Sequence, residues 1–429
     1  MSELDQVFAK CARRLIPFIA VLYFVNYVDR VNVSFAALTM NRDLAFSPSI
    51  YGLGAGIFFW GYLLFQIPAN AVLVRVGARR WIFSIMAVWG AISAANAFVR
   101  SPETFYALRF LLGVAEAGFF PGMVLYLTYW FPQAYRARFI AGFMVAIPLA
   151  FVIGGPLSGV ILRMDGALSL HGWQWLFVIE GLPAFFLAFA VLAFLPDGPA
   201  SASWLSGEEK NAISTSLAAD SASLDQRFLP ALFDPRVLAL GLIYFGVNFG
   251  RYGVELWLPQ IVQGMGVSNL ATGFVVALPY ALGMGAMIFW GRSSDRHGER
   301  IWHVALPALT AAAACAVASF AQNDLLVFVS LATVVISLLA VQGPFFSLPS
   351  SYLTGAAAAG GIALINTLGT GLGGLLGPYV IGRLKESTGG YGSSMATLAL
   401  ALLLSAVIAL ALGRATVARR AALRPPVGG

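Results

Sequence analysis

The stretch Gly291-Arg292-Ser293-Ser294-Asp295-Arg296-His297-Gly298-Glu299-Arg300 decides the fold, because a weaker copy of it occurs earlier in the chain. The copy, Asn70-Ala71-Val72-Leu73-Val74-Arg75-Val76-Gly77-Ala78-Arg79-Arg80, lies 221 residues before it and keeps a glycine between basic residues. A long internal repeat indicates two halves of similar structure. In a very apolar chain, such a repeat is typical of a transporter made of two helical bundles that hold the substrate between them.

Further pairs of residues extend the repeat over most of the chain. The offset of 221 also aligns Tyr23 with Tyr244 and Arg30 with Arg251. Gly155-Pro156 and Gly377-Pro378 match at an offset of 222. The repeat therefore covers whole bundles and is not confined to one loop.

The composition predicts an integral membrane protein. Hydrophobic residues make up 59% of the 429 residues and charged residues 10%, against about 45–50% and about 25% in soluble domains. A transmembrane helix needs about 20 mostly apolar residues. Twelve stretches qualify, so we expect an all-α fold with twelve spans, at roughly 15–40, 50–74, 81–99, 104–131, 138–162, 174–195, 236–263, 270–291, 301–320, 325–347, 356–382 and 393–413.

The spacing of the spans predicts two six-helix bundles, 1–196 and 236–429, joined by a cytoplasmic linker at 197–235. The motif Pro196-Asp197-Gly198-Pro199 ends the sixth apolar run. Ser206 and Glu209 are spaced as a capping box, which predicts a short polar helix in the linker. We expect this linker to be a plain connector.

The basic residues predict which way the chain crosses the membrane. Most of the 26 Lys and Arg residues fall on one side when both termini are placed in the cytoplasm, as the positive-inside rule requires. We therefore expect a multi-pass protein of a bacterial inner membrane. The net charge of +7 is then explained by contact with anionic lipid, and no nucleic-acid partner is expected.

The sequence predicts neither a cofactor nor a metal site nor an enzyme. Its two cysteines, Cys11 and Cys315, lie far apart, and no catalytic motif occurs. Gly369-x-Gly371-x-x-Gly374 matches a dinucleotide fingerprint, but it lies in an apolar span with no preceding strand. We interpret Gly369, Gly373 and Gly377 as a stripe of small residues that lets two helices pack closely.

Ionisable residues inside predicted spans are the candidates for function, because a charge at mid-membrane costs roughly 2.5–3.5 kcal/mol on insertion scales. Three spans carry such residues, in the pairs Asp29 and Arg30, Arg109 and Glu116, and Arg251 and Glu255. A cavity-facing Arg can bind a carboxylate through two hydrogen bonds. A substrate that occupies this Arg would free a neighbouring acid to bind a proton, which links substrate to proton.

A structural role remains an alternative for each of these pairs. Arg251 and Glu255, at i and i+4, can neutralise each other within one helix. Arg109 and Glu116 could simply fix the fourth span. We expect Glu180 to lie near the outer interface and to fix the sixth span.

Several longer motifs resemble the major facilitator superfamily and, within it, the anion:cation symporter family of organic-acid permeases. The repeated basic loop resembles the superfamily motif. The more specific stretches are Asn26-Tyr-Val-Asp-Arg-Val-Asn-Val33, Phe59-Trp-Gly-Tyr62, Arg109-Phe-Leu-Leu-Gly-Val-Ala-Glu-Ala-Gly-Phe-Phe-Pro121, Gly343-Pro-Phe-Phe346 and Ala363-Leu-Ile-Asn366. The resemblance runs over almost the whole chain and implies the two-bundle fold of that superfamily.

The resemblance also implies roles for single residues. Arg30 would hold the substrate carboxylate, Asp29 and Glu116 would take protons, and Arg109 would partner these acids. Further residues would contribute to substrate binding, namely Tyr27, Tyr62, Gln342, Phe346 and Asn366. Arg251 is a candidate for substrate binding because it is a charged residue inside a span, and not because of the resemblance. The loop motifs would act in gating through Arg75, Gly77, Arg79 and Arg80 in the first copy and Gly291, Asp295, Arg296, Gly298 and Arg300 in the second.

The first loop departs from the superfamily pattern. Asn70 stands where Gly is usual and Val74 where Asp is usual. We therefore expect a gating salt bridge only in the second copy, between Asp295 and Arg296. The role of Arg251 and Glu255 stays open, because many bacterial relatives have uncharged residues there.

The leading hypothesis for function is proton-coupled uptake of a small organic anion by a monomeric transporter in the bilayer. The anion would be a hydroxy or sugar acid such as tartrate or galactonate, or an aromatic acid such as phthalate or 4-hydroxyphenylacetate. An exporter or antiporter of an organic anion or a drug-like molecule is the alternative. A membrane sensor or an enzyme is a third class that no motif supports.

Overall fold

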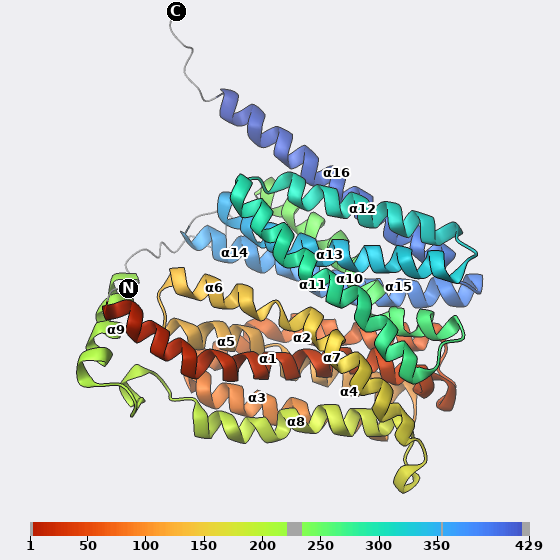
Figure 1. The fold of residues 1–429 in the computed structure, drawn as a ribbon, viewed down its shortest axis with the longest axis horizontal. Helices are drawn as coiled ribbons and strands as arrows, with labels where there is room; N and C mark the ends of the chain where they lie inside the picture. The colour runs from red at the N-terminus through yellow and green to blue at the C-terminus, as the bar shows by residue number, and fades with distance from the viewer. Residues whose placement is uncertain (1–2, 221–233, 353–354, 423–429) are drawn as a thin grey trace, which may run out of the picture. The chain divides into compact units, whose positions relative to one another are not determined.

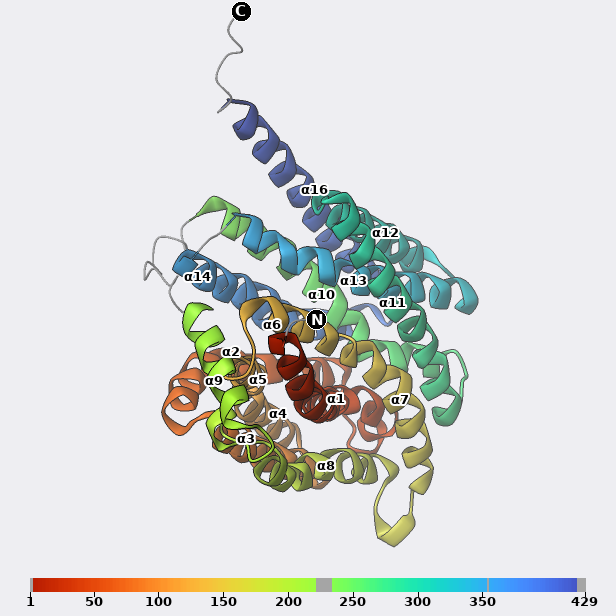
Figure 2. The same ribbon diagram turned by 60° about the vertical axis from the view of Figure 1, so that its left-hand side comes forward.

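The computed structural model describes residues 3–220, 234–352 and 355–422, and these residues form helices and connecting turns without a strand. Figures 1 and 2 show the helices from two directions. Their bounds are α1 Glu3–Asp43, α2 Pro48–Val76, α3 Ala78–Ala95, α4 Pro102–Glu116, α5 Phe119–Thr128, α6 Gln133–Phe143, α7 Ala146–Ile161, α8 Gly172–Phe194, α9 Gly207–Asp220, α10 Pro235–Gly264, α11 Asn269–His297, α12 Ile301–Phe320, α13 Asp324–Tyr352, α14 Gly355–Asn366, α15 Gly373–Thr388 and α16 Gly392–Ala422.

The helices are long and apolar enough to cross a membrane, as the sequence predicted. Within the described residues, 11 candidate spans begin with Pro48–Val76 and end with Gly392–Ala415. The predicted first span lies within α1, a helix of 41 residues. Apolar side chains on the helices are exposed where no neighbour covers them, such as Phe186 at 63% and Phe194 at 70% on α8. The prediction of an all-helical membrane protein is confirmed.

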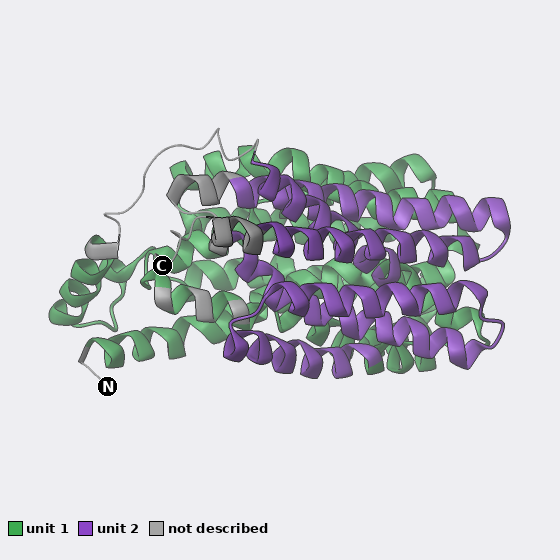
Figure 3. Ribbon diagram, turned by 90° about the horizontal axis from the view of Figure 1, so that it is seen from above, with its two compact units in different colours: residues 1–224, 256–278 green, residues 225–255, 279–429 purple. Residues whose placement is uncertain are grey.

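Two compact units make up the chain (Figure 3). Unit 1 contains Met1–Leu224 together with Leu256–Leu278, and unit 2 contains Asp225–Glu255 together with Pro279–Gly429. The predicted domain limits, 1–196, 197–235 and 236–429, remain a prediction, and residues 221–233 of the linker lie outside the described residues.

Glycines set the close packing of helices in unit 1. A Cβ on Gly61 of α2 would lie 2.2 Å from the carbonyl oxygen of Phe110, and one on Gly113 of α4 would lie 1.9 Å from that of Phe58. These backbones are therefore too close for any side chain at either position. Figures 1 and 2 show α3 and α8 side by side, where Gly90 approaches the backbone of Phe185.

The connection between α10 and α11 packs within unit 1. Tyr51 of α2 donates from its hydroxyl to the carbonyl oxygen of Leu256 at 2.7 Å. The Nε2 of Gln263 donates to the carbonyl oxygen of Leu38 at 3.1 Å. A Cβ on Gly273 of α11 would lie 2.2 Å from the carbonyl oxygen of Gly155 in α7. Leu256–Leu278 is thus held to α1 and α2 by hydrogen bonds between a side chain and a backbone carbonyl, and to α7 by a close approach of the two backbones.

In unit 2 the predicted stripe of small residues packs against α10. A Cβ on Gly369 would meet the ring of Tyr244 at 2.1 Å, one on Gly373 would lie 3.0 Å from backbone atoms of α10, and one on Gly377 would lie 2.5 Å from the carbonyl oxygen of Phe249. The close packing predicted for this stripe is confirmed.

Both units contain an irregular turn directly after a predicted site residue. In unit 1, α4 ends at Glu116 and α5 starts at Phe119, so the third apolar span in the described set, Pro102–Thr128, is broken there. In unit 2, the π-helix Thr367–Leu372 follows Asn366 and precedes α15. Breaks of this kind interrupt backbone hydrogen bonding and occur often at functional sites.

The linker helix α9 is docked on unit 1. Lys10 of α1 contacts both carboxylate oxygens of Glu209 at 2.8 Å. The indole of Trp204 stacks on that of Trp130 with 5.6 Å between the ring centroids, and the guanidinium of Arg14 lies 5.2 Å from the Trp204 centroid. Hydrogen bonds from Lys10 and from the backbone of Ser206 lower the pKa of Glu209. These contacts attach the first half of the linker to α1 and to Trp130, which lies between α5 and α6.

Candidate functional site

A buried ion pair between α1 and α4 forms the centre of the candidate site in unit 1. The Nη2 of Arg30 lies 2.9 Å from the Oε2 of Glu116, and the side-chain exposures are 13% and 0%. The amide of Asn26, one turn before Arg30 on α1, donates to the same oxygen at 2.8 Å. The other carboxylate oxygen of Glu116 is buried and accepts no hydrogen bond within the described residues. Glu116 therefore holds Arg30 with one oxygen while the second is unused.

Asp29 points toward a different set of partners. Its Oδ1 accepts hydrogen bonds from the hydroxyl of Ser93 on α3 and from the amide of Asn32, the latter at 2.9 Å. The residue is fully buried. Neighbours in sequence on a helix point about 100° apart, which explains why Asp29 and Arg30 face α3 and α4, respectively.

Arg109 is buried on α4, seven residues before Glu116, and 1% of its surface is exposed. Its Nε and Nη1 donate no hydrogen bond in the part of the chain that the structure describes. The charges of Glu116, Asp29 and Arg30 all act on it, and its guanidinium lies 5.1 Å from the ring centroid of Phe58. Glu116, one of the two acids that Arg109 is expected to partner, thus forms its ion pair with Arg30.

Aromatic rings surround the guanidinium of Arg30. The ring centroids of Tyr27, Phe58 and Tyr62 lie 5.6, 5.2 and 5.2 Å from its Cζ. Cation–π attraction at such distances favours a charged guanidinium that is partly removed from water. Three aromatic rings, two of which carry hydroxyl groups, therefore lie beside Arg30.

The second group of predicted residues lies in unit 2. The Nε of Arg251 is 3.9 Å from the Oε2 of Glu255 one turn later, and both residues are buried. The guanidinium also lies 4.2 Å from the ring centroid of Tyr252. The structure therefore contains the intrahelical pair that the spacing allows, at the long end of the ion-pair range.

The remaining predicted binding residues of unit 2 lie on α13 and α14. Gln342 is 3% exposed, and its buried Nε2 donates no hydrogen bond within the described residues. Phe346 is 44% exposed and lies edge-on to Tyr244, with 5.7 Å between centroids. Asn366 lies at the end of α14, next to the π-helix. A cavity of about 210 Å³ between α11, α12 and α13 is lined by other residues.

The first basic loop connects α2 to α3 through Gly77 alone, which has a φ of 86°. Arg79 pairs with Asp197 at 3.0 Å and donates to the carbonyl oxygen of Leu192. Arg75 and Arg80 are exposed. The first loop therefore contacts the start of the linker.

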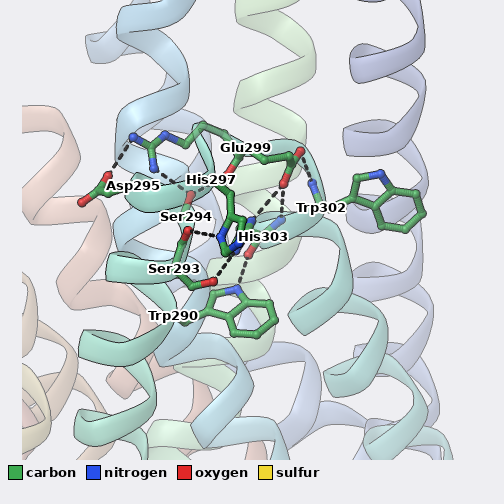
Figure 4. Close-up of polar contacts among 9 residues, drawn as sticks. Trp290, Ser293, Ser294, Asp295, His297, Glu299, Trp302 and His303 are labelled. Carbon is green, nitrogen blue, oxygen red and sulfur yellow. Dashed lines mark hydrogen bonds and ion pairs between the residues drawn. The ribbon is translucent and has the colours of Figure 1, made fainter.

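The second loop forms a denser network (Figure 4). Arg300 lies 2.7 Å from the Oδ1 of Asp295 and donates to the hydroxyl of Ser294 at 2.7 Å. Asp295 thus forms its ion pair with Arg300, where the sequence had suggested Arg296. Gly298 has a φ of 61°, and Gly77 in the first copy also has a positive φ, of 86°. Both copies of the loop therefore contain a glycine with a positive φ, which other residues rarely adopt.

Glu299 caps the start of α12 in the same network. Its carboxylate accepts from the backbone N–H of Trp302 at 2.8 Å and of His303 at 3.2 Å, and contacts the His303 ring at 2.9 Å. Burial raises its pKa, but these hydrogen bonds outweigh burial and lower the pKa below its ordinary value.

Several residues of the site were missed from the sequence. Asn26, Phe58 and Ser93 are uncharged, and a polar or aromatic residue on an apolar helix gives no specific signal. Glu180, expected near the outer interface, is 3% exposed in unit 1 and accepts a hydrogen bond from Ser158 at 2.7 Å. The roles assigned to the predicted site residues remain predictions.

Comparison with known proteins gives consistent matches over nearly the whole chain. The family model described as "Major Facilitator Superfamily" matches residues 19–378. A protein of Agrobacterium vitis named "Putative tartrate transporter" is 47% identical over 96% of both chains. A protein of Acinetobacter baumannii named "Quinolone resistance transporter" is 42% identical over 92% of both chains.

A solved structure shares the fold at low sequence identity. It is a bacterial homologue of the human lysosomal transporter Spinster in an inward-facing, unoccupied conformation, with a TM-score of 0.78, 18% identity, and coverage of 96% of this chain and 98% of that chain. The all-helical, twofold-repeated architecture expected from the sequence is thus found in a known transporter fold.

Proposed function

The chain belongs to the major facilitator superfamily, and we propose that it is a secondary active transporter that takes up a small organic carboxylate together with protons. We further propose that both termini lie in the cytoplasm of a bacterium, because most basic residues then fall on the inner side. The relative named as a tartrate transporter supports an organic acid as the substrate. Within that class, a hydroxy or sugar acid and an aromatic acid both fit the rings beside Arg30.

The observation that carries the proposal is the ion pair between Arg30 and Glu116. A substrate carboxylate is a stronger ligand for Arg30 than the single oxygen of Glu116, because it can accept two parallel hydrogen bonds from the guanidinium. When the substrate displaces Glu116, the freed carboxylate stays buried and loses its cation. Binding a proton then removes the cost of an unpaired buried charge.

The charges of the cluster support the same sequence of events. Asp29, Arg30, Arg109 and Glu116 contribute two acids and two bases. An incoming monocarboxylate leaves one negative charge in excess, and one proton restores neutrality. Since moving one charge through the membrane potential involves about 2.3 kcal/mol per 100 mV, a neutral loaded cluster crosses with less work. A dicarboxylate would require a second proton or a second cation, for which Arg251 is a candidate.

Uptake into proteoliposomes tests the proposal. Labelled tartrate, galactonate, phthalate and 4-hydroxyphenylacetate are offered with and without an inward proton gradient. We expect gradient-driven accumulation of one acid by the wild type. The Glu116→Gln variant is expected to lose accumulation and to keep exchange, because Gln cannot release a proton. Failure of all four acids would refute this proposal.

Export is a second candidate function, favoured by the 42% identity to a relative named as a quinolone resistance transporter. An exporter would accumulate substrate inside inverted vesicles or would move it outward only when protons flow inward. Measuring quinolone and carboxylate fluxes in both gradient directions separates the two functions.

A further inference from the structure

Unit 1 buries one more acid than the proposed mechanism uses. Glu180 of α8 is 3% exposed. Its Oε1 accepts a hydrogen bond from the hydroxyl of Ser158 on α7 at 2.7 Å. Its Oε2 is buried and has no hydrogen-bond partner in the residues that the structure describes. A carboxylate with a single neutral donor is an unsatisfied buried charge, which is costly.

Among the residues that the structure describes, Glu180 forms no ion pair, and its one hydrogen bond comes from a neutral hydroxyl. From α1, Asp29 acts on Glu180 electrostatically, and it carries the same sign of charge. From α7 and α3, the groups at hand are the neutral Ser158 and Ser93; a Cβ on the adjacent Gly181 would lie 2.8 Å from the Ser93 hydroxyl oxygen.

The short helical turns that contact the start of α8 place no positive charge next to Glu180. The turn Leu162–Met164 contacts the start of α8 at Gly172, and its Arg163 is exposed. The turn Asn96–Phe98 is uncharged and accepts a hydrogen bond from Gln174 at the carbonyl oxygen of Ala97. Both contacts lie about two turns before Glu180, roughly 9 to 12 Å along the helix.

Ser93 of α3 lies beside Gly181, the residue that follows Glu180. Its hydroxyl donates to the carboxylate of Asp29. Asp29 and Glu180 are both buried in unit 1, and the charge of Asp29 acts on Glu180. Two buried acids that repel each other disfavour the state in which both are ionised. Of the three buried acids of unit 1, Glu116 forms an ion pair with Arg30. The charge of Arg109 acts on Asp29, whereas no cation acts on Glu180 among the described residues.

We propose that Glu180 binds a proton and is held as a neutral carboxylic acid at neutral pH, as a third buried acid of unit 1 in addition to Asp29 and Glu116. Oε2 carries the proton and Oε1 accepts from Ser158. The resident proton leaves Asp29 and Glu116 as the acids that balance Arg30 and Arg109. This assignment deepens the proposed function and rests on it only for the role of the cluster in transport, since the protonation state is a property of the folded protein alone.

Infrared difference spectroscopy of the purified protein at pH 7 tests the proposal. The spectrum of the wild type minus that of Glu180→Gln is expected to show one protonated-carboxyl stretching band. The Ser158→Ala variant is expected to move this band to higher frequency, because the carbonyl oxygen loses its donor. Glu103→Gln is the matched control. Glu103 is exposed, so its substitution should remove carboxylate bands only.

Carboxylate bands in the difference for Glu180→Gln, with no protonated-carboxyl band, would overturn the proposal. A protonated-carboxyl band at the same frequency in Ser158→Ala and in the wild type would also overturn the proposal. The comparison of these two proteins can be made even if Glu180→Gln does not fold. The absence of any carboxylate transport would refute the proposed function and would leave the infrared result intact, so the two failures are distinguishable.

Discussion

Replacing Gly273 by Ala should open the contact between α7 and the start of α11. The added Cβ would lie 2.2 Å from the carbonyl oxygen of Gly155, whereas ordinary contact begins at 3.4 Å. The two backbones must therefore separate by about 1 Å, since a packed interior does not compress. Inserting a methyl group into such a contact costs about 1–3 kcal/mol, which shifts an equilibrium between closed and open contacts by roughly 5- to 150-fold.

The rate of thiol labelling at position 272 measures this opening. Thr272 is fully buried beside the contact, so a cysteine there should react only when the contact opens. Replacing Cys11 and Cys315 by Ala leaves Thr272→Cys as the sole thiol. Adding Gly273→Ala should then raise the rate of maleimide labelling in detergent by the same factor, because reaction follows the population of the open form.

Gly285→Ala is the control, because Gly285 lies in the same helix and a Cβ there would have no neighbour within 4 Å. It should leave the labelling rate of Thr272→Cys unchanged. Equal rates in the Gly273→Ala and Gly285→Ala backgrounds would refute the argument that the Gly155–Gly273 approach holds this contact closed.

Three further predictions concern stability and docking. Arg30→Ala should lower the free energy of unfolding by about 3–5 kcal/mol, because it leaves the buried carboxylate of Glu116 without its cation. Arg42→Ala, whose side chain is 79% exposed, should lower it by at most about 1 kcal/mol. Denaturation in detergent compares the two variants, and equal losses would contradict the argument. Glu299→Ala should lower the free energy of unfolding by at most about 1 kcal/mol at neutral pH. The pKa of Glu299 in the folded protein is lowered from the ordinary 4.5, so its carboxylate stabilises the fold above pH 4.5, and this stabilisation is lost as the pH falls through the folded pKa. The difference in melting temperature between the variant and the wild type should therefore vanish in acid. Trp204→Ala should increase hydrogen exchange in α9. The control Trp302→Ala, which changes an exposed side chain of unit 2, should leave the exchange in α9 unchanged. Unchanged exchange in Trp204→Ala would show that the stacking on Trp130 does not hold α9 in place.

The sequence predicted those features that depend on one helix at a time. Apolar stretches of about 20 residues gave the spans, and the cost of buried charge gave Asp29, Arg30, Arg109 and Glu116. Which acid meets which base depends on how α1 rotates against α4. The seven-residue spacing of Arg109 and Glu116 suggested a pair, but Arg30 holds Glu116 in the structure.

Other features depended on packing that has no pattern in the sequence. Ser93 is one of many serines on apolar helices, and only the position of α3 next to Asp29 and Gly181 gives it significance. The placement of Leu256–Leu278 with unit 1 also could not be predicted. A span count assigns a whole helix to one bundle, whereas contacts can divide a long helix between two.

The joint at Gly77 has a mechanical consequence. A single residue, Gly77, separates the last residue of α2 from the first residue of α3, so the two helices are connected through two backbone torsion angles. At about 1.5 Å per residue, the 29 residues of α2 and the 18 residues of α3 make helices about 44 and 27 Å long. With such a short connection, a shift of one helix along its axis must move the end of the other helix by nearly the same amount. A tag or an inserted residue at this position would therefore let α2 and α3 move partly independently of each other.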